Sequence, residues 1–197
     1  MLRSELTDLH FITAIENLPS ILQHGILSHN QMLQRHHVSV ALQAVQDRRA
    51  KKVVPGGRAL HDYANLYICA RNPMMFLRRG QHQNLSVLSI SPAVLDIAGT
   101  VITDQNAASD YVRYAASPDG LVHVNRDLTF ARNWTHPGDQ IAEWRHKAAK
   151  CAEVLVPDSV HPNNIQRIYV SGDIARQRAE AIQQSKPVQI YADLFFQ

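Results

Sequence analysis

The chain has 197 residues, of which 45% are apolar and 19% are charged, close to the averages of globular proteins. This composition excludes a disordered chain, a collagen-like repeat and a long coiled coil. The length predicts a single domain over residues 1–197. The net charge of +3, with 11 histidines, weakly favours partners that carry phosphate.

Neither a disulfide framework nor a metal site is expected. Cys69 and Cys151 are the only cysteines, too few for a framework or for a cysteine-based zinc site. His36 and His37 are adjacent, so their side chains diverge on any regular element, and a polar loop is the favoured interpretation. The N-terminus carries acids where a signal peptide needs an apolar run, and no stretch approaches about 20 apolar residues. We therefore expect a cytoplasmic protein without membrane contact.

In chain order, the first strand is expected at residues 9–15, where β-branched and aromatic residues mix. Asn17 and Pro19 then predict the start of a short helix, and Gly25 its end. Further strands are expected at residues 65–70, 85–90, 100–103, 151–156, 165–170 and 188–196.

Helices are expected between these strands. Two begin at the Asn72-Pro73 and Ser91-Pro92 pairs, and others span residues 139–150 and 173–184, the last capped by Asp173. Residues 106–116 are compatible with a helix, and residues 118–120 with a turn. Short strands with scattered helices in no strict alternation predict an α+β fold.

The common catalytic fingerprints are absent. The sequence holds no GxGxxG, no GxxxxGK[ST], no HExxH and no GxSxG. A Rossmann nucleotide site, a P-loop, a zinc protease and an α/β-hydrolase are therefore excluded. Candidate chemistry has to come from residues in unusual surroundings.

His10 and Glu153 are polar residues inside apolar strands. A lone strand histidine such as His10 is either a satisfied core residue or a ligand contact. A carboxylate is costly to bury without a partner, so an inward Glu153 would have a purpose. The alternative is that Glu153 faces solvent. An inward acid could contact ribose hydroxyls or stabilise a developing cation.

A basic run lies within the first third of the chain, at residues 48–58. It holds five cations and no acid, and it leads into Pro-Gly-Gly; the cations are Arg48, Arg49, Lys51, Lys52 and Arg58. Such a run is either a solvated face or a site for a pyrophosphate or a nucleic-acid backbone.

Six short segments follow one another in a specific order. They are His10-Phe11-Ile12-Thr13 with Asn17-Leu18; Arg48-Arg49-Ala50 with Val54-Pro55; Leu60-His61-Asp62-Tyr63; Asn72-Pro73-Met74; Asn106-Ala107; and Ala152-Glu153-Val154-Leu155-Val156. In this order and spacing the chain resembles, over essentially its whole length, the DarT family of DNA ADP-ribosyltransferase toxins.

The resemblance implies the ADP-ribosyltransferase fold, a split and mostly antiparallel sheet with peripheral helices around an NAD cleft. It also implies an activity, the transfer of ADP-ribose from NAD onto a base of single-stranded DNA with release of nicotinamide. The implied partners are single-stranded DNA and a macrodomain antitoxin, DarG. No metal is implied, and the modified base is left open because related branches differ.

Site residues follow from the same resemblance. It makes Glu153 and Arg49 catalytic, with Arg49 chosen over Arg48 by its place before the Ala-x-x-x-Val-Pro run. Cofactor contacts would be His10, Phe11, Ile12, Asn17 and Arg49. Residues 34–53 would cover the cofactor, and residues 106–153 would read the target.

The first strand departs from the family pattern. In many members the polar residue of this strand lies six positions before the asparagine, and here that position is Phe11, with His10 one earlier. Because side chains alternate along a strand, either the strand carries a bulge or His10 does not take the usual role.

The target-reading segment combines aromatic residues and cations, as single-strand readers do. The predicted nucleic-acid contacts are Tyr111, Arg113, Arg132, Trp134 and Lys147, with Tyr114, Arg145 and Lys150 nearby. Each aromatic has core packing as its alternative, which we favour for Trp144. Two other functions stay open: the same transfer onto RNA, and a non-catalytic nucleic-acid-binding module, which would need no Glu153.

Overall fold

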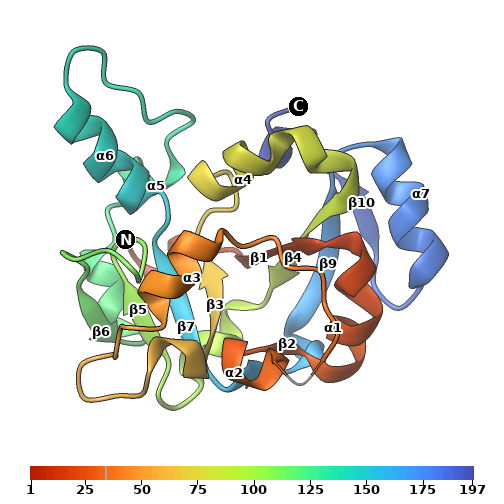
Figure 1. Ribbon diagram of the computed structural model, residues 1–197, viewed down its shortest axis with the longest axis horizontal. Helices are drawn as coiled ribbons and strands as arrows, with labels where there is room; N and C mark the ends of the chain where they lie inside the picture. The colour runs from red at the N-terminus through yellow and green to blue at the C-terminus, as the bar shows by residue number, and fades with distance from the viewer. Residues whose placement is uncertain (34) are drawn as a thin grey trace.

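An eight-stranded sheet runs through the structure, a computed structural model that describes residues 1–33 and 35–197 (Figure 1). The strand order is β10-β9-β4-β1-β3-β7-β5-β6, and only the β9–β10 pair is parallel among the described pairs. The strands are β1 (Leu9–Ala14), β3 (Tyr63–Tyr67), β4 (Leu85–Ile90), β5 (Val101–Thr103), β6 (Tyr114–Ala116), β7 (Glu153–Pro157), β9 (Ile165–Val170) and β10 (Val188–Ile190). A separate ribbon pairs β2 (Ile26–Leu27) with β8 (Ser159–Val160).

The sheet is split between β1 and β3. One register pair, His10 opposite Tyr67, joins these two strands, whereas β1 pairs with β4 along all of Leu9–Ala14. Two four-stranded halves therefore meet at a single point. This confirms the α+β prediction and the split, mostly antiparallel sheet.

Helices lie around both faces of the sheet (Figure 1). The α-helices are α1 (Leu18–His24), α2 (His29–Met32), α3 (Gln43–Arg49), α4 (Pro73–Arg78), α5 (Arg126–Phe130), α6 (Gln140–Ala149) and α7 (Asp173–Ile182). Short 3-10 turns are η1 (Arg3–Glu5), η2 (Ile15–Asn17), η3 (Leu60–Asp62), η4 (Arg79–Asn84), η5 (Pro92–Asp96), η6 (Asp119–His123), η7 (Pro162–Asn164) and η8 (Ala192–Phe195). No helix in these ranges is long and apolar enough to cross a bilayer.

Alternation along β1 divides the core in two. Leu9 points to the face where α1 and α7 pack, and Ile12 points to the face where α4 and η8 pack. Burying each such side chain stabilises the fold by about 1.5–3 kcal/mol. The second face also carries a smaller cluster around Leu60 and Leu155, and polar side chains lie between the two clusters.

Four sequence predictions of local structure are wrong. Residues 106–116 form turns that end in β6, because Asp104 accepts a hydrogen bond from the Arg113 amide and closes a loop instead of a helix. The last strand stops at Ile190, since Phe195 turns into the second core. Asn17 precedes α1 but its side chain makes no capping bond. Helix α7 likewise begins at Asp173 without a side-chain cap.

Candidate active site

Five polar side chains lie in one row across the sheet. The register sets His10 opposite Tyr67, Tyr67 opposite Glu153, Glu153 opposite Thr103, and Thr103 opposite Tyr114. Directly paired residues point to the same face of a sheet. The row therefore crosses the junction between the two halves, on the face where α3 lies over β3 and β7 (Figure 1).

Glu153 is fully buried and fully paired. Its carboxylate accepts hydrogen bonds from one Arg49 guanidinium nitrogen, at 3.2 Å to Oε1 and 3.0 Å to Oε2, and from the Ala107 amide at 3.1 Å. Its own amide donates to the Thr103 hydroxyl at 3.1 Å. A buried carboxylate needs such compensation. Glu153 therefore faces inward, and the solvent-facing alternative is wrong.

The last turn of α3 separates two adjacent arginines. Arg49 is buried and reaches Glu153, whereas Arg48 is exposed. Two other members of the basic run form ion pairs with acids at the surface, Lys52 with Asp110 and Arg58 with Asp158. The structure therefore brings only Arg49 of this run to Glu153, among the contacts of the described residues.

His10 is buried at one end of the row. It is 8% exposed, its Nδ1 has no hydrogen-bond partner among the described residues, and its Nε2 lies 3.5 Å from an Asp8 carboxylate oxygen. Burial lowers the pKa of His10, against the opposing effect of Asp8. An orphaned buried nitrogen is costly, and a polar ligand beside the Arg49–Glu153 pair would satisfy it. These residues thus fit a polar dinucleotide such as NAD.

The departure at the first strand has a simple outcome. β1 pairs with β4 in unbroken register from Leu9 to Ala14, so β1 carries no bulge. His10 and Ile12 therefore share the face of Glu153, and Phe11 points to the opposite face, against the first core. The side chain of Phe11 cannot take part in a site on the Glu153 face.

Asn17 holds the segment that was expected to cover the cofactor. Its side-chain nitrogen donates to the Val38 carbonyl at 2.8 Å and to the Thr13 hydroxyl at 3.1 Å, and its oxygen accepts from the Val38 amide at 2.9 Å. This side chain is 7% exposed. Asn17 thus ties residues 35–40 to the first strand. Gln34, the first residue of the predicted cover, lies outside the described residues.

Sequence reasoning missed Tyr67, and it named Tyr114 only as an aromatic residue of the target-reading segment and not as a member of this row. Burial and the charge of Glu153 raise the pKa of Tyr67 and of Tyr114, so both stay phenols that can donate hydrogen bonds. Tyr114 donates to the Ala107 carbonyl at 2.5 Å, next to the amide that binds Glu153. Cross-strand register was the signal that could have found them, and it required knowing which strands pair.

A stacked histidine pair adjoins Arg49 and was also missed as a pair. The rings of His29 on α2 and His61 on η3 are 4.0 Å apart between centroids and inclined by 33°. Burial lowers the pKa of both. The charge of Arg49 acts in the same direction on each, as do His37 on His29 and His29 on His61, whereas Asp62 opposes the shift of His61. His61 Nε2 is buried without a partner among the described residues.

The five predicted nucleic-acid contacts do not share one setting. Tyr111 is 91% exposed, and Arg113 and Arg132 are exposed too. Lys147 is partly exposed and pairs with Glu143 at 2.6 Å. Trp134 is buried against the edges of Phe76 and Phe196, which leaves it no free face for a base.

Two further expectations for this segment are wrong. Trp144 is 59% exposed on α6 instead of packed in the core. Lys150 is fully buried, and its ammonium donates to the Thr129 and Ala131 carbonyls at 2.9 and 2.8 Å and to the Cys69 sulfur at 3.5 Å. Lys150 therefore links the end of α5 to Cys69, just after β3, and its ammonium is not available to a phosphate.

No group of three or more His, Cys, Asp or Glu side chains in the described ranges is placed to hold a metal ion. A surface hollow of about 740 Å³ lies beside β6 and includes Tyr63 and Tyr114 in its lining, but neither Arg49 nor Glu153. The Arg49–Glu153 ion pair occupies the centre of the row and does not border this hollow.

The chain matches a family model and is similar to several known proteins. A family model described as DarT, ssDNA thymidine ADP-ribosyltransferase, matches residues 10–196. A DNA ADP-ribosyl transferase of Thermus sp. (strain 2.9) is 34% identical over 165 residues, which cover 77% of this chain and 75% of that protein. A DNA ADP-ribosyl transferase–DNA ADP-ribosyl glycohydrolase fusion protein of Thermosipho africanus (strain H17ap60334) is 31% identical over 176 residues. The match spans 83% of this chain but only 42% of the fusion protein.

Solved structures agree with the sequence relatives. Thermus sp. 2.9 DarT in complex with ADP-ribosylated ssDNA superposes with a TM-score of 0.83 at 25% identity, covering 97% of each chain. The same protein in complex with NAD+ gives a TM-score of 0.79 and covers 97% of this chain and 98% of that chain.

Proposed function

We propose, from the premise that this chain belongs to the DarT family of single-stranded-DNA thymidine ADP-ribosyltransferases, that it transfers ADP-ribose from NAD onto thymidine in single-stranded DNA. Nicotinamide is the released product. The observation that carries the proposal is the buried Glu153–Arg49 pair, in the row of polar side chains that crosses the junction of the two half-sheets. Relatives from Thermus are solved with NAD+ and with ADP-ribosylated ssDNA, which supports both substrates.

A buried acid favours catalysis over simple anion binding. A site that only holds phosphates gains nothing from a carboxylate, which repels them. Bound NAD supplies a ribose whose bond to nicotinamide breaks with development of positive charge. Glu153 would stabilise this charge, which is greatest in the transition state, in a site that excludes water.

Arg49 and His10 would bind and orient the dinucleotide. Arg49 supplies a charged planar donor set suited to a diphosphate, while its present bonds hold the Glu153 carboxylate in place. His10 offers, in the same row, an Nδ1 that has no partner among the residues the structure describes. The proposed chemistry assigns the charge stabilisation to Glu153 and calls for no metal ion.

Exposed residues of the target-reading segment would contact the single-stranded DNA. Tyr111, Arg113 and Arg132 are open to solvent, and Trp144 presents a free ring where Trp134 does not. Stacking and cationic contacts of this kind bind single strands.

A reversing partner is part of the proposal. The Thermosipho relative joins a DNA ADP-ribosyl transferase to a DNA ADP-ribosyl glycohydrolase in one chain. We therefore propose that a macrodomain antitoxin of the DarG type removes the mark made by this chain, which would act as the toxin. We place the reaction in the cytoplasm, where NAD and DNA are both present.

Incubation with labelled NAD tests the proposed function. One sequence is supplied as a thymidine-containing single DNA strand, as a blunt DNA duplex and as RNA with uridine in place of thymidine, and the mass of each product is measured by mass spectrometry. We expect one added ADP-ribose on the single DNA strand and little on the duplex, because flipping a paired base costs a few kcal/mol. Equal labelling of duplex and single strand would contradict the proposal, and labelling of RNA alone would reassign the substrate.

A further inference from the structure

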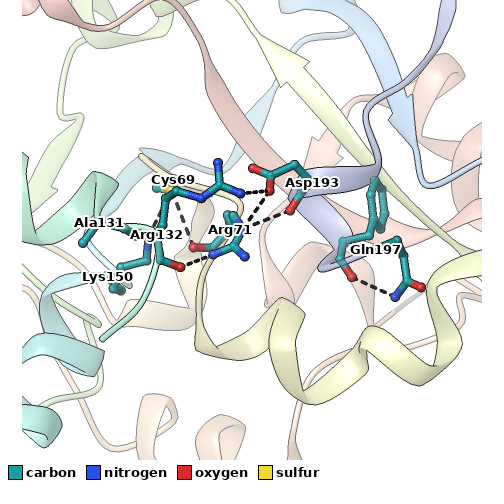
Figure 2. A network of polar contacts seen from close by, with 8 residues as sticks. Cys69, Arg71, Ala131, Arg132, Lys150, Asp193 and Gln197 are labelled. Carbon is teal, nitrogen blue, oxygen red and sulfur yellow. Dashed lines mark hydrogen bonds and ion pairs between the residues drawn. The ribbon is translucent and has the colours of Figure 1, made fainter. Parts of the chain in front are cut away.

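The C-terminal turn η8 is fastened to the target-reading segment by charged side chains (Figure 2). The Asp193 carboxylate accepts a hydrogen bond from the Arg132 guanidinium at 2.6 Å and lies 3.5 Å from Nε of Arg71. Arg71 also donates from Nε to the Asp193 carbonyl at 3.0 Å and from Nη1 to the Arg132 carbonyl. Asp193 thus binds both Arg71 and Arg132, and Arg71 also binds the backbone carbonyl of Arg132.

Aromatic packing runs parallel to this polar network. Arg71 stacks over the Phe196 ring at 4.1 Å, and Phe196 meets Trp134 edge-on at 5.9 Å between centroids. Phe196 adopts a φ of 61°, in the left-handed region that side-chain-bearing residues rarely enter. Packing of its ring offsets that strain, so the C-terminus is held in one arrangement.

The segment that these contacts hold has little structure of its own. Between α5 and α6, residues 131–139 form neither helix nor strand. Lys150 fixes its start through the Thr129 and Ala131 carbonyls, and the C-terminal contacts fix Arg132 and Trp134. Without Asp193, the Arg132 guanidinium, whose side chain is 78% exposed, would sample many rotamers.

We infer that Asp193 is a positioning residue for the DNA strand, which sets Arg132 and residues 131–134 in the arrangement that receives single-stranded DNA. The inference rests on the proposed function. The location of Asp193 fits this role, because its partner Arg71 follows β3, four residues after Tyr67 of the row of polar side chains. Among the described contacts, the Asp193 carboxylate meets Arg71 and Arg132 and no residue of the row, so we assign it no part in the reaction itself.

The direction in which Asp193→Ala changes the KM for DNA separates a positioning role from a purely electrostatic one. Removing an acid from a cationic surface strengthens polyanion binding if the acid only contributes charge. We expect the opposite from Asp193→Ala: KM for single-stranded DNA rises at least fivefold, while KM for NAD and the DNA-independent consumption of NAD stay unchanged. Asp193→Glu, which keeps the charge, restores part of the loss. Asp173→Ala is the matched control, because Asp173 pairs with Arg176 within helix α7 and, among the described contacts, with neither Arg71 nor Arg132.

Hydrogen exchange provides an arm that does not need DNA. Asp193→Ala is expected to speed amide exchange in residues 131–135 and to leave β7 unchanged. An unchanged or lowered KM for DNA would overturn the inference, as would a parallel loss of both reactions, which indicates general unfolding. Absence of DNA labelling by the unaltered chain would instead overturn the proposed function, and unaltered exchange in residues 131–135 would then overturn the inference as well.

Discussion

Glu153 is held by paired strands, whereas Arg132 is held by side chains that come from distant parts of the chain. The register of β3, β5 and β7 fixes the position of Glu153 and of its row, so backbone pairing decides its environment. Arg132 lies in an irregular segment whose shape depends on Lys150, Arg71 and Asp193. The chemistry is thus built on the rigid part of the fold, and recognition on a part that single substitutions can loosen.

The largest effects on activity are expected at the centre of the row, at Glu153 and its partner Arg49. Arg49→Ala should lower kcat/KM by at least about 100-fold, since losing a buried charged contact costs about 3 kcal/mol. Arg48→Ala, one residue away and exposed, should stay within about threefold of the unaltered chain. Steady-state transfer to labelled DNA measures both.

Arg49→Ala also leaves Glu153 buried without its ion-pair partner, so the unfolding midpoint of each variant has to be recorded. Arg49→Lys keeps the charge with a less suitable geometry and should retain partial activity. An inactive Arg48→Ala beside a near-normal Arg49→Ala would show that the wrong arginine has been assigned.

A loss of stability is expected when Lys150, which binds two carbonyls at the start of the irregular segment, is replaced. Lys150→Met removes a buried ammonium and leaves the Thr129 and Ala131 carbonyls without it, which should cost about 2 kcal/mol of unfolding free energy. Lys147→Met is the control, because the exposed Lys147–Glu143 pair should be worth about 0.5 kcal/mol. Urea unfolding measures the difference. Equal destabilisation by the two variants would refute the role of Lys150.

The stability of the row of polar side chains that ends at His10 should respond to acid. Burial lowers the pKa of His10 in the folded chain, so the unfolded chain binds its proton more readily. The contribution of His10 to stability is therefore complete above about pH 6.5 and is lost as the pH falls towards its lower folded pKa. Urea midpoints at pH 7 and pH 5 should differ less in His10→Gln than in the unaltered chain. The exposed His123→Gln variant should show no such flattening.

The smallest effects are expected at single phosphate contacts. Arg113→Ala should reduce the slope of log affinity against log salt by about 0.7 on single-stranded DNA. NAD affinity should not change, because Arg113 is exposed in the target-reading segment. Titration of a labelled strand at several salt concentrations measures the slope. A slope that stays the same would remove Arg113 from the DNA path.

The same comparison explains what the sequence could predict. Strands β4 and β9 were predicted with the observed bounds, and Glu153 with its inward orientation as one of two alternatives, because alternation and apolar runs are local signals. The resemblance selected Arg49, and the structure brings Arg49 to Glu153.

Long-range contacts account for the rest. Nothing near Trp134 or Trp144 in the sequence says which of them meets Phe196, so their exposures were assigned the wrong way round. The burial of Lys150 depends on carbonyls 19 and 21 residues away. Tyr67 and Tyr114 join the row only through strand pairings that no local pattern encodes.

The most direct test of the catalytic assignment is Glu153→Gln in the intact chain. The substitution keeps the shape of the side chain and removes the charge that the proposed mechanism needs. We expect transfer to single-stranded DNA to fall by about 1000-fold, while NAD still binds and the chain unfolds cooperatively. A folded Glu153→Gln variant that modifies DNA at a rate near that of the unaltered chain would contradict the account.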